Sequence, residues 1–382
     1  MTSNDTDPRE PRWPDFAHTG PGTLAGRYLR SFWQPVYVAA QVLNARPMPL
    51  RVMGELFTIF RGESGRVQVV AGRCAHRGTQ LSTGTIEGDQ LRCFYHGWRY
   101  DMAGQCTERP AEPACGSSVK IRSYPTREWA GLVFAYLGEG EPPTFQKLDT
   151  LDGNGHLDIT APLRPFNYFQ QLENGLDEVH FSFVHRLSRF STQGLNAELP
   201  VLTCEETPYG LARVSMRRDV ARHTHFLMPN VGVSLLFGAW HVVWRVPVDD
   251  VSHISFTIDY FEGSQDEVAR FKADRELDAK RVSTAVPASE LAAAVLRGEL
   301  RVEDLTEHPD LLSVQDGVAL SGQGLIADRH HETLGASDAH IVRLRRLWAQ
   351  EMRTMDQGHP VREWRWPARL EVTSGLAQAE YA

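Results

Sequence analysis

The chain has 382 residues, of which 42% are hydrophobic and 23% are charged, and a formal net charge of −8. This length allows two domains with ordinary cores, and the acidic balance argues against a general nucleic-acid-binding protein. No segment of about 18 apolar residues occurs, so we expect no transmembrane helix. Five cysteines, an odd number, fit a reducing compartment better than a disulfide framework. We therefore expect a cytoplasmic protein.

The first part of the chain predicts a polar arm followed by a β-rich domain. Residues 1–20 are polar and proline-rich, which suggests a loosely held arm, and a short helix is expected at about 22–32, so the arm and helix together take up residues 1–33. Strand patterns follow within 34–145, where ELFTIF and RVQVVAG flank the turn-like RGESGR and WAGLVFAYLG gives another strand. We expect 34–145 to be an all-β domain.

The character of the chain changes behind a linker-like segment at 138–155. Residues 165–190 predict helical structure, 211–261 predict several strands, and helices dominate from Ser264 onward. We therefore expect 146–382 to form a larger α+β domain, in which an antiparallel sheet is flanked by helices.

Two short Cys/His pairs stand in the β-rich domain: Cys74 with His76, and Cys93 with His96. Four such ligands can hold a tetrahedral zinc ion or an iron–sulfur cluster. In a Rieske 2Fe–2S centre two thiolates bind one iron and two imidazoles bind the other. Because each loop then gives one ligand to each iron, the pairs must be mixed, as they are here. The alternatives are a zinc knuckle and structural Cys and His residues without a metal.

The residues around these pairs favour the cluster. Gly78 and Gly97 follow the ligand residues and would let backbone amides approach bridging sulfides. Three aromatic residues would shield the centre from water: Phe94, Tyr95 and Trp98. The segments CAHRGTQLSTG and CFYHGWRYDMAGQC resemble the two ligand loops of the Rieske family almost throughout. The resemblance implies a 2Fe–2S cluster held by both Cys/His pairs.

A second constellation lies in QQLENGLDEVHFSFVHR, which contains Asp177, His180 and His185. The two histidines are five residues apart, so on an ideal helix the second is rotated by about 140° from the first. They can converge on one ion only if the helix ends or widens near Phe183. Two imidazoles and one carboxylate form the facial triad of non-haem Fe(II), which leaves coordination positions open for O₂.

The carboxylate of such a triad can come from a distant part of the chain. Asp316 lies in an expected helix and shares its inward face with Leu312 and Leu320. An acidic residue on an apolar helix face is costly to bury unless it is paired or bound to a metal, so we expect Asp316 to be the third ligand. The alternatives are Asp310, Glu332 and Asp177.

The spacing of Asn174, Asp177, His180 and His185 resembles the mononuclear-iron motif of Rieske non-haem iron oxygenases, and Asp316 matches their downstream carboxylate ligand. The resemblance covers the whole chain and is closest to the homo-oligomeric phthalate and vanillate oxygenases. It implies an α+β fold with an all-β Rieske domain and a helix-grip-like catalytic domain, and it implies a mononuclear Fe(II) beside the 2Fe–2S cluster.

The resemblance also implies an assembly and a path for electrons. It implies a homotrimer in which Asp177 bridges His180 of its own chain and His96 of the partner subunit, with Asn174 near the iron. The protein would be the oxygenase (alpha) component, which uses O₂ to monohydroxylate, dihydroxylate or oxidatively demethylate an aromatic, carboxylated small molecule. The alternatives are a Rieske electron-transfer protein without oxygenase activity and a zinc-stabilised binding module.

The electrons must come from a partner, because no G-x-G-x-x-G loop follows a strand. We expect a separate NAD(P)H-dependent reductase with flavin and iron–sulfur groups. Four arginines near the cluster ligands could dock it or could merely support the loops: Arg73, Arg77, Arg92 and Arg99.

Substrate contacts are expected between residues 200 and 320, in an apolar wall with a few polar groups. The candidates are His223, His225, Phe226, Asn230, Phe237 and Trp240. Arg186 and Arg189, just beyond the two histidines, could bind a carboxylate or could be solvated surface residues.

Overall fold

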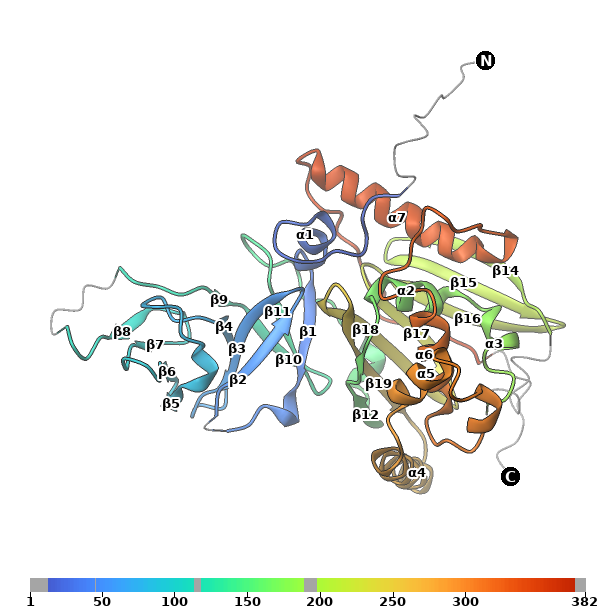
Figure 1. Ribbon diagram of the computed structural model, residues 1–382, viewed down its shortest axis with the longest axis horizontal. Helices are drawn as coiled ribbons and strands as arrows, with labels where there is room; N and C mark the ends of the chain where they lie inside the picture. The colour runs from blue at the N-terminus through green and yellow to red at the C-terminus, as the bar shows by residue number, and fades with distance from the viewer. Residues whose placement is uncertain (1–12, 45, 113–117, 189–197, 375–382) are drawn as a thin grey trace, which may run out of the picture.

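The computed structural model describes residues 13–44, 46–112, 118–188 and 198–374. It has two parts: small antiparallel sheets near the N-terminus, and one large sheet with helices beyond them (Figure 1). This is the expected α+β architecture with an N-terminal all-β domain. Within the described ranges, none of the helices combines the length and the apolar character that crossing a bilayer requires.

The N-terminal part contains three sheets, with strand orders β1-β11-β10, β2-β3-β4-β9 and β5-β6-β7-β8. The strands in each sheet pair antiparallel, as short hairpin-connected segments do. The elements are α1 (Leu24–Arg30), β1 (Trp33–Val38), β2 (Met48–Val52), β3 (Glu55–Arg61), β4 (Val67–Ala71), β5 (Thr85–Glu87), β6 (Gln90–Arg92), β7 (Arg99–Tyr100), β8 (Cys106–Glu108), β9 (Ser123–Tyr124), β10 (Thr126–Trp129) and β11 (Leu132–Tyr136).

The catalytic part is built on an eight-stranded antiparallel sheet of order β12-β19-β18-β17-β16-β15-β14, with β13 beside β19. Its strands are β12 (His156–Thr160), β13 (Leu163–Arg164), β14 (Val201–Thr207), β15 (Gly210–Arg217), β16 (Val220–Leu227), β17 (Val231–Leu236), β18 (Ala239–Asp249) and β19 (Ser252–Phe261). Its helices are α2 (Tyr168–Leu176), α3 (His180–Phe183), α4 (Gln265–Thr284), α5 (Ala288–Leu296), α6 (Leu311–Ser321) and α7 (Ala339–Asp356).

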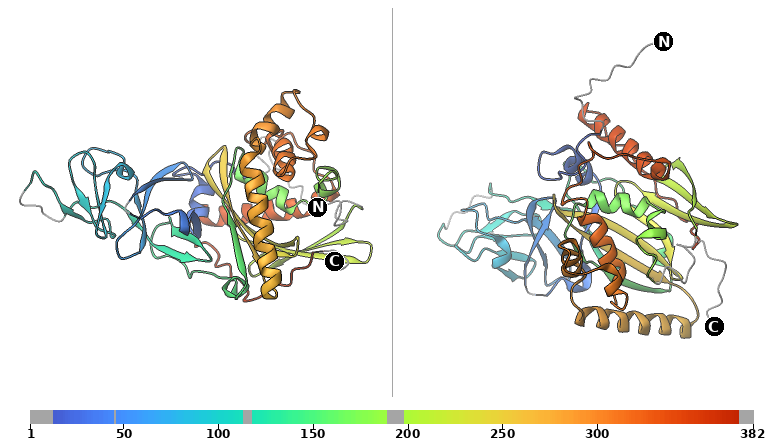
Figure 2. Two further views of the ribbon diagram at one scale, coloured as in Figure 1. Left: turned by 90° about the horizontal axis from the view of Figure 1, so that it is seen from below. Right: turned by 45° about the vertical axis from the view of Figure 1, so that its right-hand side comes forward.

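The two faces of the large sheet have different roles, and strand β18 shows why. Successive side chains of a strand point to opposite faces. Trp244 points toward the N-terminal part, where its ring centroid lies 5.6 Å from that of Phe134. His241, Val243 and Arg245 point the other way and line a cavity. Helices α2, α5 and α6 lie over this second face (Figures 1 and 2).

Two hydrophobic cores follow from this arrangement. The main core is continuous from β1–β4 and β9–β11 into the catalytic sheet and α7. A smaller core fills the tip that β5–β8 form, and it includes the buried side chains of Cys74 and Cys93. The tip is therefore a compact support for the two Cys/His loops.

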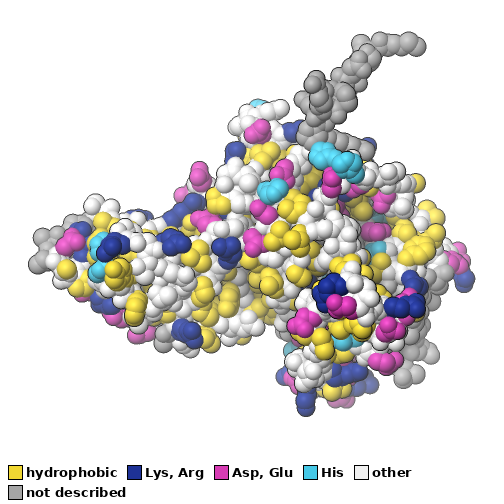
Figure 3. Space-filling view, in the orientation of Figure 1, with side chains coloured by type: hydrophobic (Ala, Val, Ile, Leu, Met, Phe, Trp, Pro, Cys, Tyr) yellow, Lys and Arg dark blue, Asp and Glu magenta, His cyan; other side chains and the backbone are white. Residues whose placement is uncertain are grey.

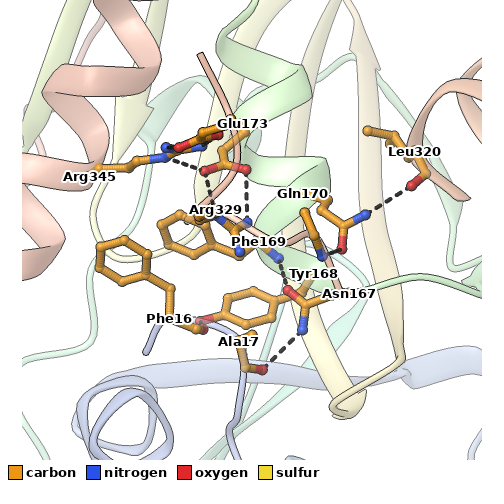
Figure 4. Close-up of polar contacts among 12 residues, drawn as sticks. Phe16, Ala17, Asn167, Tyr168, Phe169, Gln170, Glu173, Leu320, Arg329 and Arg345 are labelled. Carbon is orange, nitrogen blue, oxygen red and sulfur yellow. Dashed lines mark hydrogen bonds and ion pairs between the residues drawn. The ribbon is translucent and has the colours of Figure 1, made fainter. Parts of the chain in front are cut away.

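The segment before α1 is firmly packed where it is described, which contradicts the expectation of a loose arm. Phe16 is 1% exposed, and its ring stacks on Phe169 at 4.4 Å between centroids. The backbone carbonyls of Phe16 and Ala17 accept hydrogen bonds from Tyr168 at 2.7 Å and from Asn167 at 3.0 Å (Figure 4). The expectation rested on the polar composition of the whole segment and overlooked Phe16, whose packing holds this segment against α2.

Candidate metal centres and active-site cavity

The two Cys/His loops at the tip have the same backbone design. In each loop the cysteine N–H donates to the residue five positions later, Cys74 to Thr79 and Cys93 to Trp98, both at 2.8 Å. In each, the glycine four positions after the cysteine donates back to the cysteine carbonyl. Gly78 and Gly97 have φ values of +73° and +70°, which L side chains rarely adopt. The glycines therefore close both loops.

The four predicted ligands lie together and fit a Rieske cluster. The thiols of Cys74 and Cys93 are buried neighbours; burial raises the pKa of Cys93, and the adjacent Cys74 raises it further. The rings of His76 and His96 are exposed, with centroids 4.6 Å apart. Figure 3 shows histidine at the surface of this tip, with basic side chains beside it. Two inner thiols and two outer imidazoles are the donor set that a 2Fe–2S Rieske centre requires.

The surroundings of the cluster ligands differ partly from expectation. Trp98 is 8% exposed and stacks on the His76 ring at 4.6 Å, as a shielding residue should. Phe94 and Tyr95 are 77% and 53% exposed, so their predicted shielding role is wrong within a single chain. The pattern of residue types could not show on which side of the loop these rings would lie.

Tyr100 is a further cluster-side residue that sequence reasoning missed. Its hydroxyl lies 3.1 Å from Cys74 Sγ and accepts a hydrogen bond from the Ala75 N–H at 3.2 Å. Burial and the Cys74 thiol raise its pKa, so the hydroxyl keeps its proton and can donate to a cysteine thiolate. The sequence did offer a signal for this role, because Tyr100 follows the second ligand loop by only two residues after Trp98 and lies on β7.

The four arginines near the cluster divide into two groups. Arg92 and Arg99 are paired with acids: Arg92 Nε lies 2.6 Å from Glu87, and Arg99 Nη2 lies 2.9 Å from Glu108. These two support the loops. Arg73 and Arg77 are exposed on the ligand loops, where Arg73 donates to the Gly78 carbonyl and Arg77 lies over the Tyr95 ring.

The helix predicted at 165–190 is interrupted between Leu176 and His180 and ends at Phe183. A break near Phe183 is what convergence of His180 and His185 on one ion required. Helix α2 ends at Leu176, and α3 covers only His180–Phe183. The Asp177 carboxylate accepts hydrogen bonds from the N–H groups of Val179 at 2.8 Å and His180 at 3.3 Å, which begins the new turn. Because α3 ends at Phe183, His185 can turn toward the same point as His180.

His180, His185 and Asp316 form the candidate iron site. Their ligand atoms all lie within 4.8 Å of one another, and His185 Nε2 lies 3.3 Å from Asp316 Oδ1. Two ligands about 2.1 Å from one ion at right angles would be about 3 Å apart. The donor set and this separation fit the facial triad of non-haem iron.

Hydrogen bonds orient both imidazoles for metal binding. His185 Nδ1 donates to Gln315 Oε1 at 2.8 Å, and His180 Nδ1 donates to the Asp177 carbonyl. Each bond leaves Nε2 to face the shared point, as outer partners of metal-bound histidines do. Burial lowers the pKa of His180, which keeps its ring in the neutral form that binds metals.

The neighbouring polar residues also take definite places. Asn174 Nδ2 lies 3.3 Å from Asp316 Oδ1, so Asn174 reaches the proposed ligand. Of the alternative carboxylates, Glu332 pairs with Arg345, and Asp310 lines the cavity outside the three-residue cluster. The Asp177 side chain is used to start α3, and its backbone carbonyl, in place of its carboxylate, contacts the His180 ring.

A cavity of about 650 Å³ opens beside these three residues, between the sheet and α2, α3, α4 and α6. Of the six predicted contact residues only Phe237 lines it. Trp240 lies on the face of β18 that points away from the cavity, where it packs against the main core. His225 forms hydrogen bonds with Tyr209 and with the Glu371 carbonyl. Arg186 pairs with Glu303 at the surface, and Arg189 lies outside the described residues.

The cavity is basic next to the candidate iron site. Arg213 and Arg245 line it and are 3% and 8% exposed. Burial lowers the pKa of each to about 10, so both stay charged at neutral pH. The Nε atoms of both are buried without a hydrogen-bond partner among the described residues. Glu178 and Asp316 are the acids that act on Arg213 and Arg245, respectively, and the Nε–H groups leave each cation able to bind a further anionic partner.

Glycines make room for Arg245. A Cβ on Gly175 would lie 2.7 Å from Arg245 Nη2, and one on Gly232 would lie 3.2 Å from Nη1. Sequence reasoning missed this residue, although a charged residue within the apolar run HVVWRVPV was a signal that could have found it.

Comparisons with known proteins agree with this architecture. Residues 32–125 match the family model of the Rieske [2Fe-2S] domain. The chain is 30% identical to the 5,5'-dehydrodivanillate O-demethylase oxygenase subunit of Sphingobium sp., over 90% of this chain and 80% of that protein. It is 29% identical to the phenoxybenzoate dioxygenase subunit alpha of Ectopseudomonas oleovorans, over 90% and 86%. A carbazole-bound oxygenase in complex with ferredoxin, from carbazole 1,9a-dioxygenase, shares the fold with a TM-score of 0.64 and 20% identity, over 86% and 91%.

A Rieske domain joined to a candidate site for a second metal and a cavity beside it is the architecture of a terminal oxygenase. The chain belongs to the Rieske non-haem iron oxygenases, enzymes that carry a Rieske 2Fe–2S cluster and a mononuclear non-haem iron. The predicted family, fold class and cofactors are thereby confirmed. The alternative of a bare electron-transfer protein is not favoured, because the relatives that match over most of their length are oxygenase subunits.

Proposed function

We propose that this chain is the oxygenase component of a multi-component system that hydroxylates or demethylates an aromatic acid. The observation that carries the proposal is the cavity in which a two-histidine, one-carboxylate cluster adjoins the buried cations Arg213 and Arg245. Relatives are named for dehydrodivanillate and phenoxybenzoate, both aromatic acids. A benzoate-like carboxylate would complete the hydrogen bonding of these arginines and offset their charge.

In the proposed assignment Cys74, His76, Cys93 and His96 hold the cluster, within an N-terminal domain of residues 34–145. His180, His185 and Asp316 hold the iron, in a catalytic domain of residues 146–382. When bound, the cluster supplies single electrons and the iron supplies O₂ activation. The chain's own part is to orient both imidazoles through Nδ1 and to fix the acid with arginines.

The electrons would pass between subunits in a head-to-tail homotrimer. The cluster tip and α3 lie on opposite sides of the molecule (Figure 1). This separation supports electron transfer from the cluster of one subunit to the iron of a neighbouring copy. Exposed aromatic side chains mark both ends: Phe94 and Tyr95 at the tip are 77% and 53% exposed, and Phe183 beside the iron histidines is 58% exposed. Covering these surfaces with a second subunit would be favourable. Asp177 would then link the two centres, with its backbone carbonyl on the His180 ring and its carboxylate toward His96 of the partner subunit.

An external partner would reduce the cluster. The carbazole oxygenase above was solved with ferredoxin, which supports a small iron–sulfur protein or an NAD(P)H-dependent reductase as the donor. Arg73 and Arg77 remain as candidate docking residues, since Arg92 and Arg99 are bound to Glu87 and Glu108.

Iron, zinc and acid-labile sulfide per chain test the assignment in anaerobically purified protein. About three irons and two sulfides are expected from one 2Fe–2S cluster and one mononuclear site. Consumption of O₂ and oxidation of NADH, measured after an aromatic acid and a reductase are added, then test the activity. Zinc without sulfide would contradict the cluster assignment, and uptake with neutral aromatics but with no acid would contradict the substrate class.

A further inference from the structure

A second polar cluster lines the same cavity, away from the basic end. His241 of β18 and Asp259 of β19 are cross-strand partners, and His241 Nδ1 lies 2.7 Å from Asp259 Oδ1. Arg275 of α4 donates to Asp259 Oδ2 and to Asp158 Oδ2, both at 2.6 Å. All four side chains line the cavity, and neither metal-site assignment uses them.

We propose that His241 forms a second substrate subsite, which binds a hydroxyl group on the far ring of a two-ring aromatic acid. The inference rests on the proposed function, because the acid would be anchored at Arg245. Asp259 is an acceptor only, so His241 Nδ1 must donate to it. Nε2 has no hydrogen-bond partner among the described residues and, in the neutral ring, accepts a hydrogen bond.

A purely structural role explains Arg275 and leaves His241 unexplained. Arg275 joins α4 to β12 and β19 through two ion pairs, which fasten that helix to the sheet. His241 contacts Asp259 within the sheet itself, where the strands are already joined by their ladder. Its side chain is 26% exposed, so it remains accessible from the cavity.

The spacing of the two polar ends sets the length of the ligand. His241 and Arg245 lie on one face of β18, four residues apart, which at about 3.3 Å per residue places their Cα atoms about 13 Å apart. Between them lies Val243, flanked by Gly232 of β17 and Thr257 of β19. One benzene ring with its carboxylate is too short to reach both ends, whereas two linked rings can, with their apolar parts over Val243.

Charge selects the group at the far end. Three described carboxylates line that end, those of Asp158, Asp259 and Asp278, and all three raise the pKa of the cation Arg275. Among these described residues three carboxylates surround one arginine, so this end is acidic, whereas the Arg245 end is basic. A second carboxylate would be repelled there, and a phenolic hydroxyl, which donates a proton to Nε2, would not. The cavity is therefore suited to an acid at one end and a neutral donor at the other.

Equilibrium binding to the holoenzyme, anaerobic and without reductant, tests the subsite. The probes are benzoate, a biphenyl carboxylate, and that acid with either a hydroxyl or a second carboxylate on the far ring. We expect the hydroxyl to tighten binding by about three- to tenfold, as one neutral hydrogen bond does, and the second carboxylate to weaken it. His241→Phe should abolish the hydroxyl preference and leave benzoate binding unchanged. His223→Phe, the same change outside the cavity lining, should keep the preference.

The outcomes separate this inference from the proposed function. Equal binding of the biphenyl acid with and without the hydroxyl by the wild type overturns the subsite alone, and so does a hydroxyl preference that survives in His241→Phe. Tighter binding of the dicarboxylate than of the hydroxyl acid also overturns it. If neither benzoate nor any biphenyl acid binds to the wild type, the aromatic-acid function fails and the subsite fails with it.

Discussion

Replacement of Arg245 by methionine should separate substrate binding from stability. The guanidinium is buried, its Nε lacks a partner among the described residues, and burial has already lowered its pKa to about 10. A buried cation without full compensation is costly, and an apolar residue of similar length is often neutral or stabilising there. The melting temperature of the holoenzyme should therefore stay the same or rise. Loss of a desolvated charge pair with an acid costs about 2–5 kcal/mol, so affinity should fall by about 30-fold or more.

Calorimetry with an aromatic acid that the wild type turns over would measure the affinity, and a thermal melt would measure stability. Arg186→Met is the matched control, because Arg186 is exposed, pairs with Glu303 and lies outside the cavity lining. The control should leave both quantities unchanged. The primary amide of the same acid should bind Arg245→Met about as well as it binds the wild type, because the amide carries no charge.

Opposite behaviour would refute this reasoning. If Arg245→Met melts several degrees lower than the wild type and binds the acid with unchanged affinity, the arginine is a structural residue. If the acid and its amide lose affinity equally, the loss comes from a changed cavity shape, and Arg245 does not recognise charge.

Three further predictions concern the metal centres. His180→Ala should lose the mononuclear iron and keep the visible spectrum of the cluster; bleaching of the cluster would contradict two separate sites. Asp177→Asn should keep about three irons per chain and lose turnover, because Asp177 would link the centres of two subunits; normal product formation with intact iron would remove this role. Tyr100→Phe should keep the cluster and lower its reduction potential by about 40 mV, the equivalent of one hydrogen bond of about 1 kcal/mol. Potentiometry would measure it, and an unchanged potential would show that the Tyr100 hydroxyl does not donate to the reduced cluster.

The candidate metal ligands could be proposed from the sequence because the chemistry of such sites depends on the spacing of ligand residues along the chain. Two Cys/His pairs with matching glycines define two equal loops, and these loops fold alike around Gly78 and Gly97. The five-residue interval between His180 and His185 required a break in the helix, and α3 does end at Phe183. Asp316 could be proposed as the third ligand because an acid on an apolar helix face needs a partner, and the structure places it beside both histidines.

The cavity-lining residues were harder to predict, because which side chains of a strand face the cavity depends on the alternation of side chains along that strand. Choosing Trp240 instead of His241 places the wrong face of β18 in the cavity, since a shift by one residue moves a side chain to the other face. Arg245 could have been found by asking why a charged residue interrupts an apolar strand. Gly175 and Gly232, which make room for it, come from two elements far apart in sequence, so only the fold shows their connection.

The two candidate metal sites differ in exposure, and this difference bears on how the enzyme would work. His76 and His96 are exposed at the tip, whereas at the candidate iron site His185 is 2% exposed and His180 and Asp316 are half-buried beside a cavity. A centre that must receive electrons from one partner and deliver them to another needs an accessible edge. A centre that handles O₂ and an anchored acid needs walls that exclude water, because buried charges such as Arg245 act strongly only in a poorly solvated site. In the proposed assembly the partner subunit covers the exposed rings at the tip, so the same contact would shield the cluster and bring it to the iron. Phe94 and Tyr95 could then shield the cluster in the trimer although they are exposed in the single chain.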